Sequence, residues 1–334
     1  MVTTPSVVGV KAIVQRVYGS SAMLAVSDVE RPEAGAGEVL VRVHAASVNA
    51  RDWHVMRGDP KIARWMDRSV FRRKGPANLV QGGDFAGTVE AVGDEVTDVA
   101  VGEEVFGEAI SGAFAEYLAV PRALLDRKPE NLSFAEAAAV PLAANTALTC
   151  LRHVNAGERV LIIGASGGVG TFAVQIARAR GAEVTAVCST RNVEAARTLG
   201  AGHVFDYTRE TVTGRYDTVV DLAGARSLRE LLSLTEPTGT LVLSGGGNFD
   251  GGSLFGPIGL FARGQLARPF VKPSIRVPLA EQSAASLKEL RELIESGDVR
   301  PAIDRTFPLA ETPAAIDYME SEHARAKIVI TVAT

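Results

Sequence analysis

The sequence has few cysteines, a nearly balanced charge and no long apolar run, and each of these features excludes a class of protein. Cys150 and Cys188 are its two cysteines. They lie in apolar surroundings without paired spacing, which excludes a disulfide framework and a cysteine zinc cluster. The net charge of −4 argues against a general nucleic-acid-binding protein. No run could span a bilayer, and Met1 to Val10 lacks the pattern of a signal peptide. We therefore expect a cytoplasmic protein that binds neither nucleic acid nor membrane.

The length of 334 residues suggests two domains, because it exceeds a typical single core. From Gly9 to about Lys128, short β-rich runs separated by glycine turns predict an all-β unit with a partly closed, barrel-like core. Strands and helices then alternate, which predicts βαβ units on a doubly wound parallel sheet. The expected fold class is therefore α/β.

Two stretches in the second half of the chain differ from this alternation of strands and helices. Ser133-Phe134-Ala135-Glu136 is a capping box that opens an alanine-rich helix. Pro141 is expected to interrupt it, with a second helix from Asn145 to about Arg152. Gly245-Gly246-Gly247 begins a Gly/Pro-rich excursion that runs through Pro278.

The stretch from Val160 to Gly170 carries the strongest functional signal. Four aliphatic residues, Val160 to Ile163, predict a buried strand, and Val169 to Arg180 has helical spacing. The glycine-rich turn between them is the context of a dinucleotide fingerprint, which presents helix amides to a pyrophosphate. Ala165 stands where the usual first glycine would be, so a tight turn without a ligand remains the alternative. The expected cofactor contacts of this turn are Ser166, Gly167, Gly168, Val169 and Gly170.

The end of the next predicted strand, Glu183 to Cys188, indicates the cofactor. An NAD-binding unit places Asp or Glu there, about 20 residues beyond the fingerprint, to bind the ribose hydroxyls. Here Ser189, Thr190 and Arg191 follow, with no acid. Hydroxyls and a guanidinium suit a 2′-phosphate, which favours NADPH. The alternative is that Ser189 caps a helix and Arg191 is merely solvated.

A basic segment from Arg57 to Asn78 breaks the β-rich pattern of the first half. It contains seven Lys or Arg residues, with Trp65, Met66 and Phe71 between them. It is either a solvated basic loop with apolar anchors or a lid over a cleft, because long loops in compact domains are often functional.

Beyond these features, the chain resembles the medium-chain dehydrogenase/reductase superfamily, and within it the zinc-independent quinone-oxidoreductase-like branch. The resemblance covers nearly the whole chain and is carried by the fingerprint and by three further motifs, which are Ala46 to Asp52, Gly83 to Val89 and Arg197 to Ala201. It implies a GroES-like β-barrel catalytic domain over residues 1–130 and a Rossmann domain over 131–277. A C-terminal segment, 278–334, would return to the catalytic domain, with the active site in the cleft between the domains.

The same resemblance indicates whether the protein binds zinc. Zinc-dependent relatives hold zinc with a cysteine and a histidine, whose positions look like Asn49 and Gly83 here. An amide and a hydrogen atom cannot replace a thiolate and an imidazole. Val101 to Glu116 also lacks the cysteine cluster of a structural zinc site. His54 and Asp84 remain nearby, but two ligands do not make a catalytic zinc site, and we expect no metal.

Without a metal, quinones and α,β-unsaturated carbonyls are the favoured hydride acceptors, because their conjugated systems delocalise the charge. We therefore expect an NADPH-dependent reductase of such small electrophiles, with a homodimer possible. One alternative is a 2-alkenal or enoyl reductase, or a reductive biosynthetic tailoring enzyme. Another is an NADPH-binding structural or sensor protein with vestigial turnover.

The resemblance also suggests roles for single residues. Asn49 and Thr146 resemble the residues that flank the nicotinamide ribose and carboxamide. Tyr207 lies where relatives contact the adenosine portion of the cofactor. Ser244 follows the predicted strand Thr240 to Leu243, and we expect it to contact the cofactor as well. Lys327 looks like the position whose basic side chain meets the pyrophosphate, although a surface lysine is the alternative.

Asn49 and His54 are the candidate catalytic residues. His54 lies where quinone reductases of this branch often place a tyrosine. Histidine can donate a hydrogen bond or a proton to an acceptor oxygen near neutral pH. The alternative is a histidine packed in a loop beside Trp53 and Val55. Asn49 is uncharged and would orient the cofactor ribose.

Overall fold

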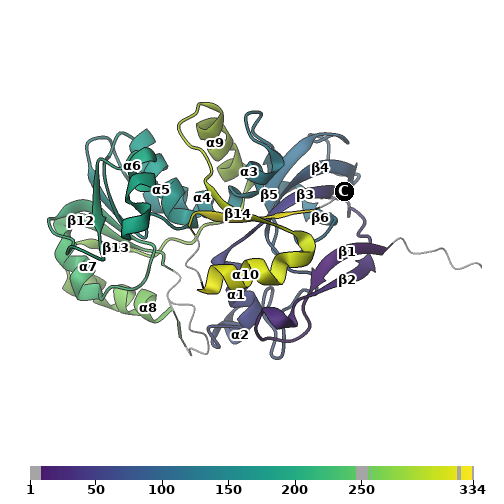
Figure 1. The fold of residues 1–334 in the computed structure, drawn as a ribbon, viewed down its shortest axis with the longest axis horizontal. Coiled ribbons are helices and arrows are strands. Elements are labelled where there is room, and N and C mark those ends of the chain that lie inside the picture. Colours follow the sequence, from purple (N-terminus) through teal and green to yellow (C-terminus); the bar gives the residue numbers. More distant parts are fainter. Residues whose placement is uncertain (1–8, 246–254, 257, 322–324, 333–334) are drawn as a thin grey trace, which may run out of the picture.

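The computed structural model describes residues 9–245, 255–256, 258–321 and 325–332, which form two α/β units side by side (Figure 1). The N-terminal part builds the catalytic domain, and the central part builds the Rossmann domain. This arrangement confirms the expected α/β fold class, with a largely antiparallel β domain joined to a doubly wound parallel sheet.

The catalytic domain consists mainly of antiparallel strands. They are β1 Gly9–Val14, β2 Ala25–Glu30, β3 Glu38–Val48, β4 Asp84–Val92, β5 Glu104–Glu108, β6 Tyr117–Pro121 and β7 Leu125–Arg127, with helices α1 Ala50–Arg57 and α2 Ala63–Met66. The 11-residue strand β3 is the centre, because it pairs with both β4 and β6. Trp53, Phe85 and Phe114 are fully buried in the core of this domain.

The Rossmann domain has six parallel strands flanked by helices. The strands are β8 Arg159–Ile163, β9 Glu183–Cys188, β10 His203–Asp206, β11 Tyr216–Asp221, β12 Thr235–Leu243 and β13 Ser274–Arg276. Its helices are α4 Pro141–Leu151, α5 Gly168–Ala179, α6 Val193–Thr198, α7 Leu228–Leu234 and α8 Ile258–Ala267, while α3 Phe134–Ala138 precedes them and packs on β3 and β4 of the catalytic domain. The spatial order is β10-β9-β8-β11-β12-β13. The chain therefore reverses direction across the sheet between β8 and β11, which is where doubly wound sheets bind their ligands.

The C-terminal segment crosses from the Rossmann domain back to the catalytic domain, as the yellow elements of Figure 1 show. Its elements are α9 Ala284–Glu295, β14 Ile303–Pro308, α10 Thr312–Ser321 and β15 Lys327–Thr331. β15 lies antiparallel to β3, with Ile328 opposite Val48, and β14 pairs with β15. This places the first residue of β15 beside the end of β3, where α1 begins.

The structure differs from the expected elements at several places. The alanine-rich helix ends at Ala138 and a second helix follows, as expected, but this second helix begins at Pro141 rather than at Asn145, because the first helical position needs no N–H donor. The region from Gly245 to Pro278 contains α8 and the edge strand β13, while residues 246–254 and 257 lie outside the described part. Two helices, α1 and α2, occupy part of the basic segment and the stretch before it.

Two simpler expectations concern cysteines and membranes. Cys150 and Cys188 are both free and buried. Burial raises the pKa of each thiol to about 11, so both are expected to be chemically inert at neutral pH. Among the described residues, the structure contains no helix of the length and apolar character needed to cross a bilayer.

Candidate active site

The fingerprint turn has the backbone geometry that its glycines allow. Gly164 leaves β8 with a φ of 86°, in the left-handed region that favours glycine. At Gly170 a Cβ atom would lie 2.1 Å from the carbonyl oxygen of Gly164, so only glycine lets α5 pack this closely on the turn. Gly167 is the N-cap of α5 and has no side chain to cover the helix amides. The start of α5 can therefore receive a pyrophosphate group.

The C-terminal segment is attached directly to this turn. The backbone N–H of Ala326 donates to the carbonyl of Ser166 at 2.8 Å, and Gly167 forms a β-bridge with Ala326. A Cβ atom at Gly168 would lie 3.1 Å from Cδ of Lys327. The side chain that follows Ala326 is therefore held beneath the glycine-rich turn, where the two domains meet.

Lys327 is one of the most buried charged residues in the described part of the chain, with 2% of its surface exposed. Its ammonium group donates to Oδ1 of Asn49 and to the carbonyl of Val48 at 3.3 Å, and lies 3.4 Å from Oδ2 of Asp84. The alternative of a surface lysine is therefore wrong. In this structure Lys327 bridges the glycine-rich turn and the end of β3.

Asp84 accepts hydrogen bonds from three further groups. Ser47 Oγ and Asn49 Nδ2 both lie 2.9 Å from Oδ2, and the backbone N–H of Leu142 lies 3.0 Å from Oδ1. Asp84 has no exposed surface. Since the Asn49 amide donates to Asp84 and accepts from Lys327, its orientation is fixed from both sides. Asn49 lies between β3 and α1, Asp84 begins β4 and Lys327 begins β15, so the cluster ties three segments of the chain together.

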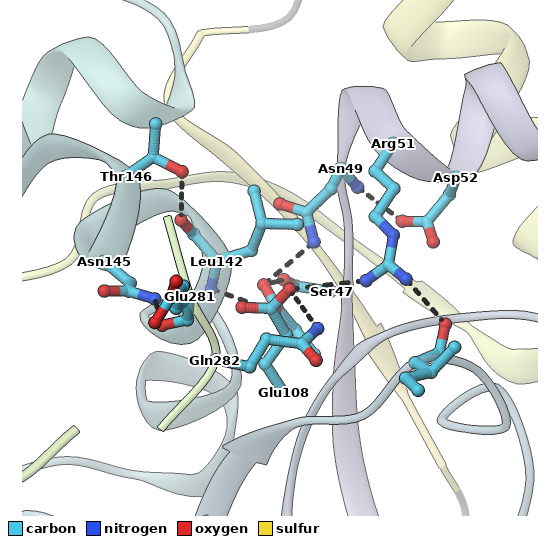
Figure 2. Close-up of polar contacts among 12 residues, drawn as sticks. Ser47, Asn49, Arg51, Asp52, Glu108, Leu142, Asn145, Thr146, Glu281 and Gln282 are labelled. Carbon is cyan, nitrogen blue, oxygen red and sulfur yellow. Dashed lines mark hydrogen bonds and ion pairs between the residues drawn. The ribbon is translucent and has the colours of Figure 1, made fainter. Parts of the chain in front are cut away.

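A second group of polar residues continues from this cluster, and Figure 2 shows Arg51, Glu108 and Gln282 converging beside Ser47 and Asn49. Gln282 Nε2 donates to Glu108 at 2.7 Å, and the Arg51 guanidinium lies 3.4 Å from the same carboxylate. Burial, together with the nearby charge of Asp84, raises the pKa of Glu108 above its usual range.

Asp52 is a third carboxyl group near the cluster. Its Oδ2 accepts from the backbone N–H of Asn49 at 2.7 Å, and the two residues form a capping box at the start of α1. Burial raises the pKa of the Asp52 carboxyl to about 7, although this hydrogen bond lowers it. Through this capping box, Asp52 fixes the start of α1 next to Asn49.

The donor set at this place does not fit a zinc ion. The amide of Asn49 is already occupied by Lys327 and Asp84, as described above. A Cβ atom at Gly83 would point to within 3.8 Å of the Arg51 guanidinium. A divalent cation would therefore face an ammonium group and a guanidinium group, with no thiolate or imidazole to hold it. In the described ranges, no group of three His, Cys, Asp or Glu side chains could hold a metal ion.

Thr146 and His54 belong to two different helices near this centre, α4 and α1. Thr146 is on α4, and its hydroxyl donates to the carbonyl of Leu142 at 2.8 Å (Figure 2). Leu142 is the residue whose backbone N–H donates to Asp84, so Thr146 lies close to the cluster. His54 lies on α1, about one helical turn after the first residue of that helix. Its Nδ1 lies 2.9 Å from the carbonyl of Asp59 and its ring packs edge-on to Trp53. The structure therefore places His54 in the helix rather than in a loop, and fixes its Nδ1 on a backbone carbonyl.

At the far end of the cofactor site, the structure adds an acid that the sequence analysis did not weigh. Asp206, at the end of β10, accepts from Thr190 Oγ1 at 2.5 Å and from Thr208 Oγ1 at 2.7 Å. These bonds hold its pKa below the usual range. Because the only hydroxyl proton of Thr190 is used, a 2′-phosphate could receive donors from Ser189 and Arg191 but not from Thr190.

The remaining expected cofactor residues also lie at the carboxyl ends of the strands. Tyr207 follows β10 and is 57% exposed, so its ring is available to an adenine or ribose. Ser244 follows β12, and its backbone N–H donates to the carbonyl of Asp221 at 3.0 Å. Ser189 accepts a hydrogen bond from Asn192 at 3.2 Å and is the N-cap of the short helix that contains Arg191.

Sequence reasoning missed three polar residues that the fold brings to the site: Glu108, Asp206 and Gln282. None of them lies in a recognisable motif, and each reaches the site through strand pairing or through the returning C-terminal segment. Asp206 alone had a local signal, because it ends a predicted strand, where ligand-contacting side chains gather.

Comparisons with known proteins agree with this geometry. A family profile described as "Alcohol dehydrogenase GroES-like domain" matches residues 35–130, and one described as "Zinc-binding dehydrogenase" matches residues 199–330. The chain is 34% identical to the mouse (Mus musculus) protein "NAD(P)H oxidoreductase RTN4IP1, mitochondrial", with 88% of this chain and 82% of the relative covered. It is 32% identical to the Arabidopsis thaliana "NADPH-dependent alkenal/one oxidoreductase, chloroplastic", with 96% and 79% covered.

A solved structure of an oxidoreductase has the same overall fold. The quinone oxidoreductase from Coxiella burnetii superposes with a TM-score of 0.84 at 29% identity, and the match covers 97% of this chain and 100% of that one. The likeness therefore extends over the catalytic domain, the Rossmann domain and the returning segment. The chain belongs to the medium-chain dehydrogenase/reductase superfamily and is an oxidoreductase that works with a nicotinamide cofactor.

Proposed function

We propose that the protein is an NADPH-dependent, zinc-independent reductase of quinones or α,β-unsaturated carbonyl compounds. The observation that carries this proposal is the buried cluster of Asn49, Asp84 and Lys327, in which Asn49 resembles a position that holds zinc in zinc-dependent relatives. Two relatives also point in this direction by name, the alkenal/one oxidoreductase and a "Chloroplast envelope quinone oxidoreductase homolog" of Arabidopsis thaliana, which is 30% identical. A cytoplasmic location and a possible homodimer stay predictions.

The cofactor would lie across the carboxyl ends of the Rossmann strands. The amides at the start of α5 would face its pyrophosphate, with Ser166, Gly168 and Val169 around it. The ammonium of Lys327 already uses its three donors on Asn49, Val48 and Asp84, so it would act beneath the turn rather than on the phosphates. Ser189 and Arg191 would bind a 2′-phosphate, Tyr207 would contact the adenosine, and Thr146 and Ser244 would lie nearer the nicotinamide. NADPH supplies a hydride at the nicotinamide ring, so the protein needs only to position it against the acceptor.

Asn49 has one defined task in this arrangement. Its amide is held between Lys327 and Asp84, but an amide has two N–H donors and two lone pairs. Oδ1 accepts from Lys327 and takes part in the capping box with Asp52, so the second N–H donor remains for a ribose hydroxyl. A positioned side chain of this kind reduces the entropy lost when the reacting atoms are aligned. Asn49 is therefore proposed to orient the cofactor rather than to move a proton.

His54 is the proposed donor to the acceptor oxygen. With Nδ1 against the carbonyl of Asp59, the neutral ring keeps its proton on Nδ1. Nε2 can then donate only when the ring is protonated. Conjugated carbonyl acceptors need such a donor more than quinones do, because a quinone tolerates an anionic product better.

An acceptor screen tests this function. Purified protein, treated exhaustively with a chelator, is mixed with NADPH and with a quinone, an enone, an enal or a simple ketone. We expect oxidation of NADPH with the conjugated acceptors, little with the ketone, and less than one zinc per chain. A rate that disappears on chelation and returns with zinc would refute the metal-free mechanism. Tight NADPH binding without turnover of any acceptor would instead support the structural or sensor alternative.

A second enzymatic candidate rests on the same site. A 2-alkenal or enoyl reductase, or a reductive biosynthetic tailoring enzyme, would use the same cofactor geometry. A relative of this kind by name is the "2-methylene-furan-3-one reductase" of Solanum lycopersicum, which is 31% identical. The enal and enone arms of the screen, compared with the quinone arm, separate this candidate from a quinone reductase.

A further inference from the structure

The basic segment after α1 encloses a pocket on the catalytic domain. The pocket has a volume of about 620 Å³ and is lined by Lys61, Arg64, Trp65, Arg68, Phe71, Arg72 and Arg73. Five of these seven residues are cationic and none is acidic. The whole chain has a net charge of −4, so this concentration of positive charge does not reflect the composition. Pockets of about 300–1,000 Å³ are typical of small-molecule sites.

Most of these cations have no counterion. Arg64 donates to the carbonyl of Gly58 at 2.7 Å and stacks on the ring of Tyr18. The other four side chains make no ion pair or hydrogen bond with any described residue, and these are Lys61, Arg68, Arg72 and Arg73. The segment contains two carboxylates, and neither lines the pocket: Asp59 is buried, and Asp67 accepts from the backbone N–H of Ser69 at 3.0 Å. Like charges around one pocket repel each other, and a bound anion would relieve that repulsion.

The backbone of the pocket is held in place by several contacts. The Tyr18 hydroxyl donates to the carbonyl of Arg72 at 2.7 Å and accepts from its N–H at 3.1 Å. The N–H of Arg72 also lies 3.0 Å from the carbonyl of Gly75, and Phe71 forms a β-bridge with Pro76. A Cβ atom at Gly75 would lie 2.3 Å from the carbonyl oxygen of Arg16, so glycine permits this close packing. The cations therefore project from a fixed frame.

The aromatic residues of the pocket favour an anion that also carries a flat ring. Phe71 is buried, while Trp65 is 72% exposed and lines the pocket. Guanidinium groups bind phosphate oxygens in pairs, and an exposed indole offers a face on which a flat base can stack. We propose that this pocket binds the phosphates and base of a nucleotide carrying at least two phosphates, either free or as the end of a larger molecule such as coenzyme A.

This pocket and the fingerprint turn are built by different parts of the chain. All seven lining residues lie between α1 and β4 of the catalytic domain, whereas the fingerprint turn and Arg191 belong to the Rossmann domain. The site is also independent of which acceptor the enzyme reduces, so it can be tested without an activity assay.

The two tryptophans give a direct binding signal. Trp53 is fully buried, so a ligand in the pocket should change mainly the fluorescence of Trp65. ADP, ATP or coenzyme A is titrated into protein whose dinucleotide site is already filled by a low, fixed concentration of NADP⁺. We expect saturable quenching with a Kd below roughly 1 mM that weakens steeply as salt increases, because the contacts are ionic. Coenzyme A binding more tightly than ADP would identify the larger molecule as the source, and equal binding would identify a free nucleotide.

Variants separate this pocket from general surface charge. The double variant Arg68→Ala/Arg73→Ala should raise the nucleotide Kd by at least about tenfold, since each lost charge-assisted contact costs about that factor. Arg229→Ala, which removes an exposed cation from α7, is the matched control and should bind as the wild type does. Trp65→Phe should lose the fluorescence signal but keep binding that is measurable by calorimetry.

Three results would overturn the proposal. The first is no binding of any of the three nucleotides at several millimolar. The second is unchanged binding by Arg68→Ala/Arg73→Ala. The third is binding of anionic phospholipid vesicles by the wild type without binding of nucleotides, which would make the basic segment a membrane-contacting surface.

Discussion

The contact between Lys327 and Asp84 should be among the most important polar contacts for the stability of the catalytic domain. Its atoms lie 3.4 Å apart, and both side chains are almost completely buried. Coulomb attraction at this distance is about 5 kcal/mol for an effective dielectric constant of about 20, and desolvation of both groups offsets much of it. Removing one partner leaves the other charge buried alone, which costs about 3–5 kcal/mol. We therefore expect Lys327→Met to lower the free energy of unfolding by that amount.

A double-mutant cycle measures the coupling itself. Asp84→Asn alone should also destabilise the protein, but the double variant Lys327→Met/Asp84→Asn should lose about 1–3 kcal/mol less than the sum of the two single losses. Urea unfolding is followed by the fluorescence of Trp53, which is fully buried in the catalytic domain. Lys11→Met is the matched control, because Lys11 lies only 2.7 Å from Asp28 but both are exposed. It should cost no more than about 1 kcal/mol. If Lys327→Met costs as little as Lys11→Met, or if the single effects simply add, the buried pair does not hold the site together.

Three further predictions concern the cofactor, the acceptor and pH. Arg191→Ala should raise the KM for NADPH by roughly one to two decades and leave the KM for NADH nearly unchanged. Steady-state kinetics with both cofactors measures this, and a wild-type enzyme that used NADPH and NADH equally well would refute it. His54→Ala should lower kcat for conjugated carbonyls by roughly ten- to a thousand-fold and affect quinones less, whereas wild-type rates on every acceptor would return His54 to a packing role. The raised pKa of Glu108 means that the folded protein holds this proton more tightly than the unfolded chain, so stability falls as pH rises through that pKa. Glu108→Gln should make the fall between pH 5 and 8 smaller, by on the order of 1–3 kcal/mol in urea unfolding, and an unchanged pH profile would contradict the buried carboxyl.

The sequence was sufficient where local chemistry decides the structure. The glycine spacing from Gly164 to Gly170 predicted the strand, turn and helix that the structure contains, because the positive φ at Gly164 and the close backbone approach at Gly170 both favour glycine. The capping box of Ser133 and Glu136 likewise begins a helix where it was expected.

The sequence was not sufficient where distant segments meet. Lys327 is separated from Asp84 by 243 positions, and only the pairing of β15 with β3 brings them together. Gln282 and Glu108 are likewise far apart in the sequence and meet only in the folded chain. Thr190 was expected to bind a phosphate, but the adjacent strand supplies Asp206, which takes its hydroxyl proton. In each case the sheet topology, rather than the local sequence, determines the partner.

Transfer of isotope from the cofactor to the acceptor tests the central claim most directly. The chelator-treated protein is incubated with NADPH carrying deuterium at both C4 positions and with an enone, and the product is analysed by mass spectrometry and NMR. The account predicts one deuterium at the β-carbon of a saturated ketone, with no metal required. Deuterium at the carbonyl carbon of an alcohol, or no deuterium in any product unless zinc is added, would contradict it.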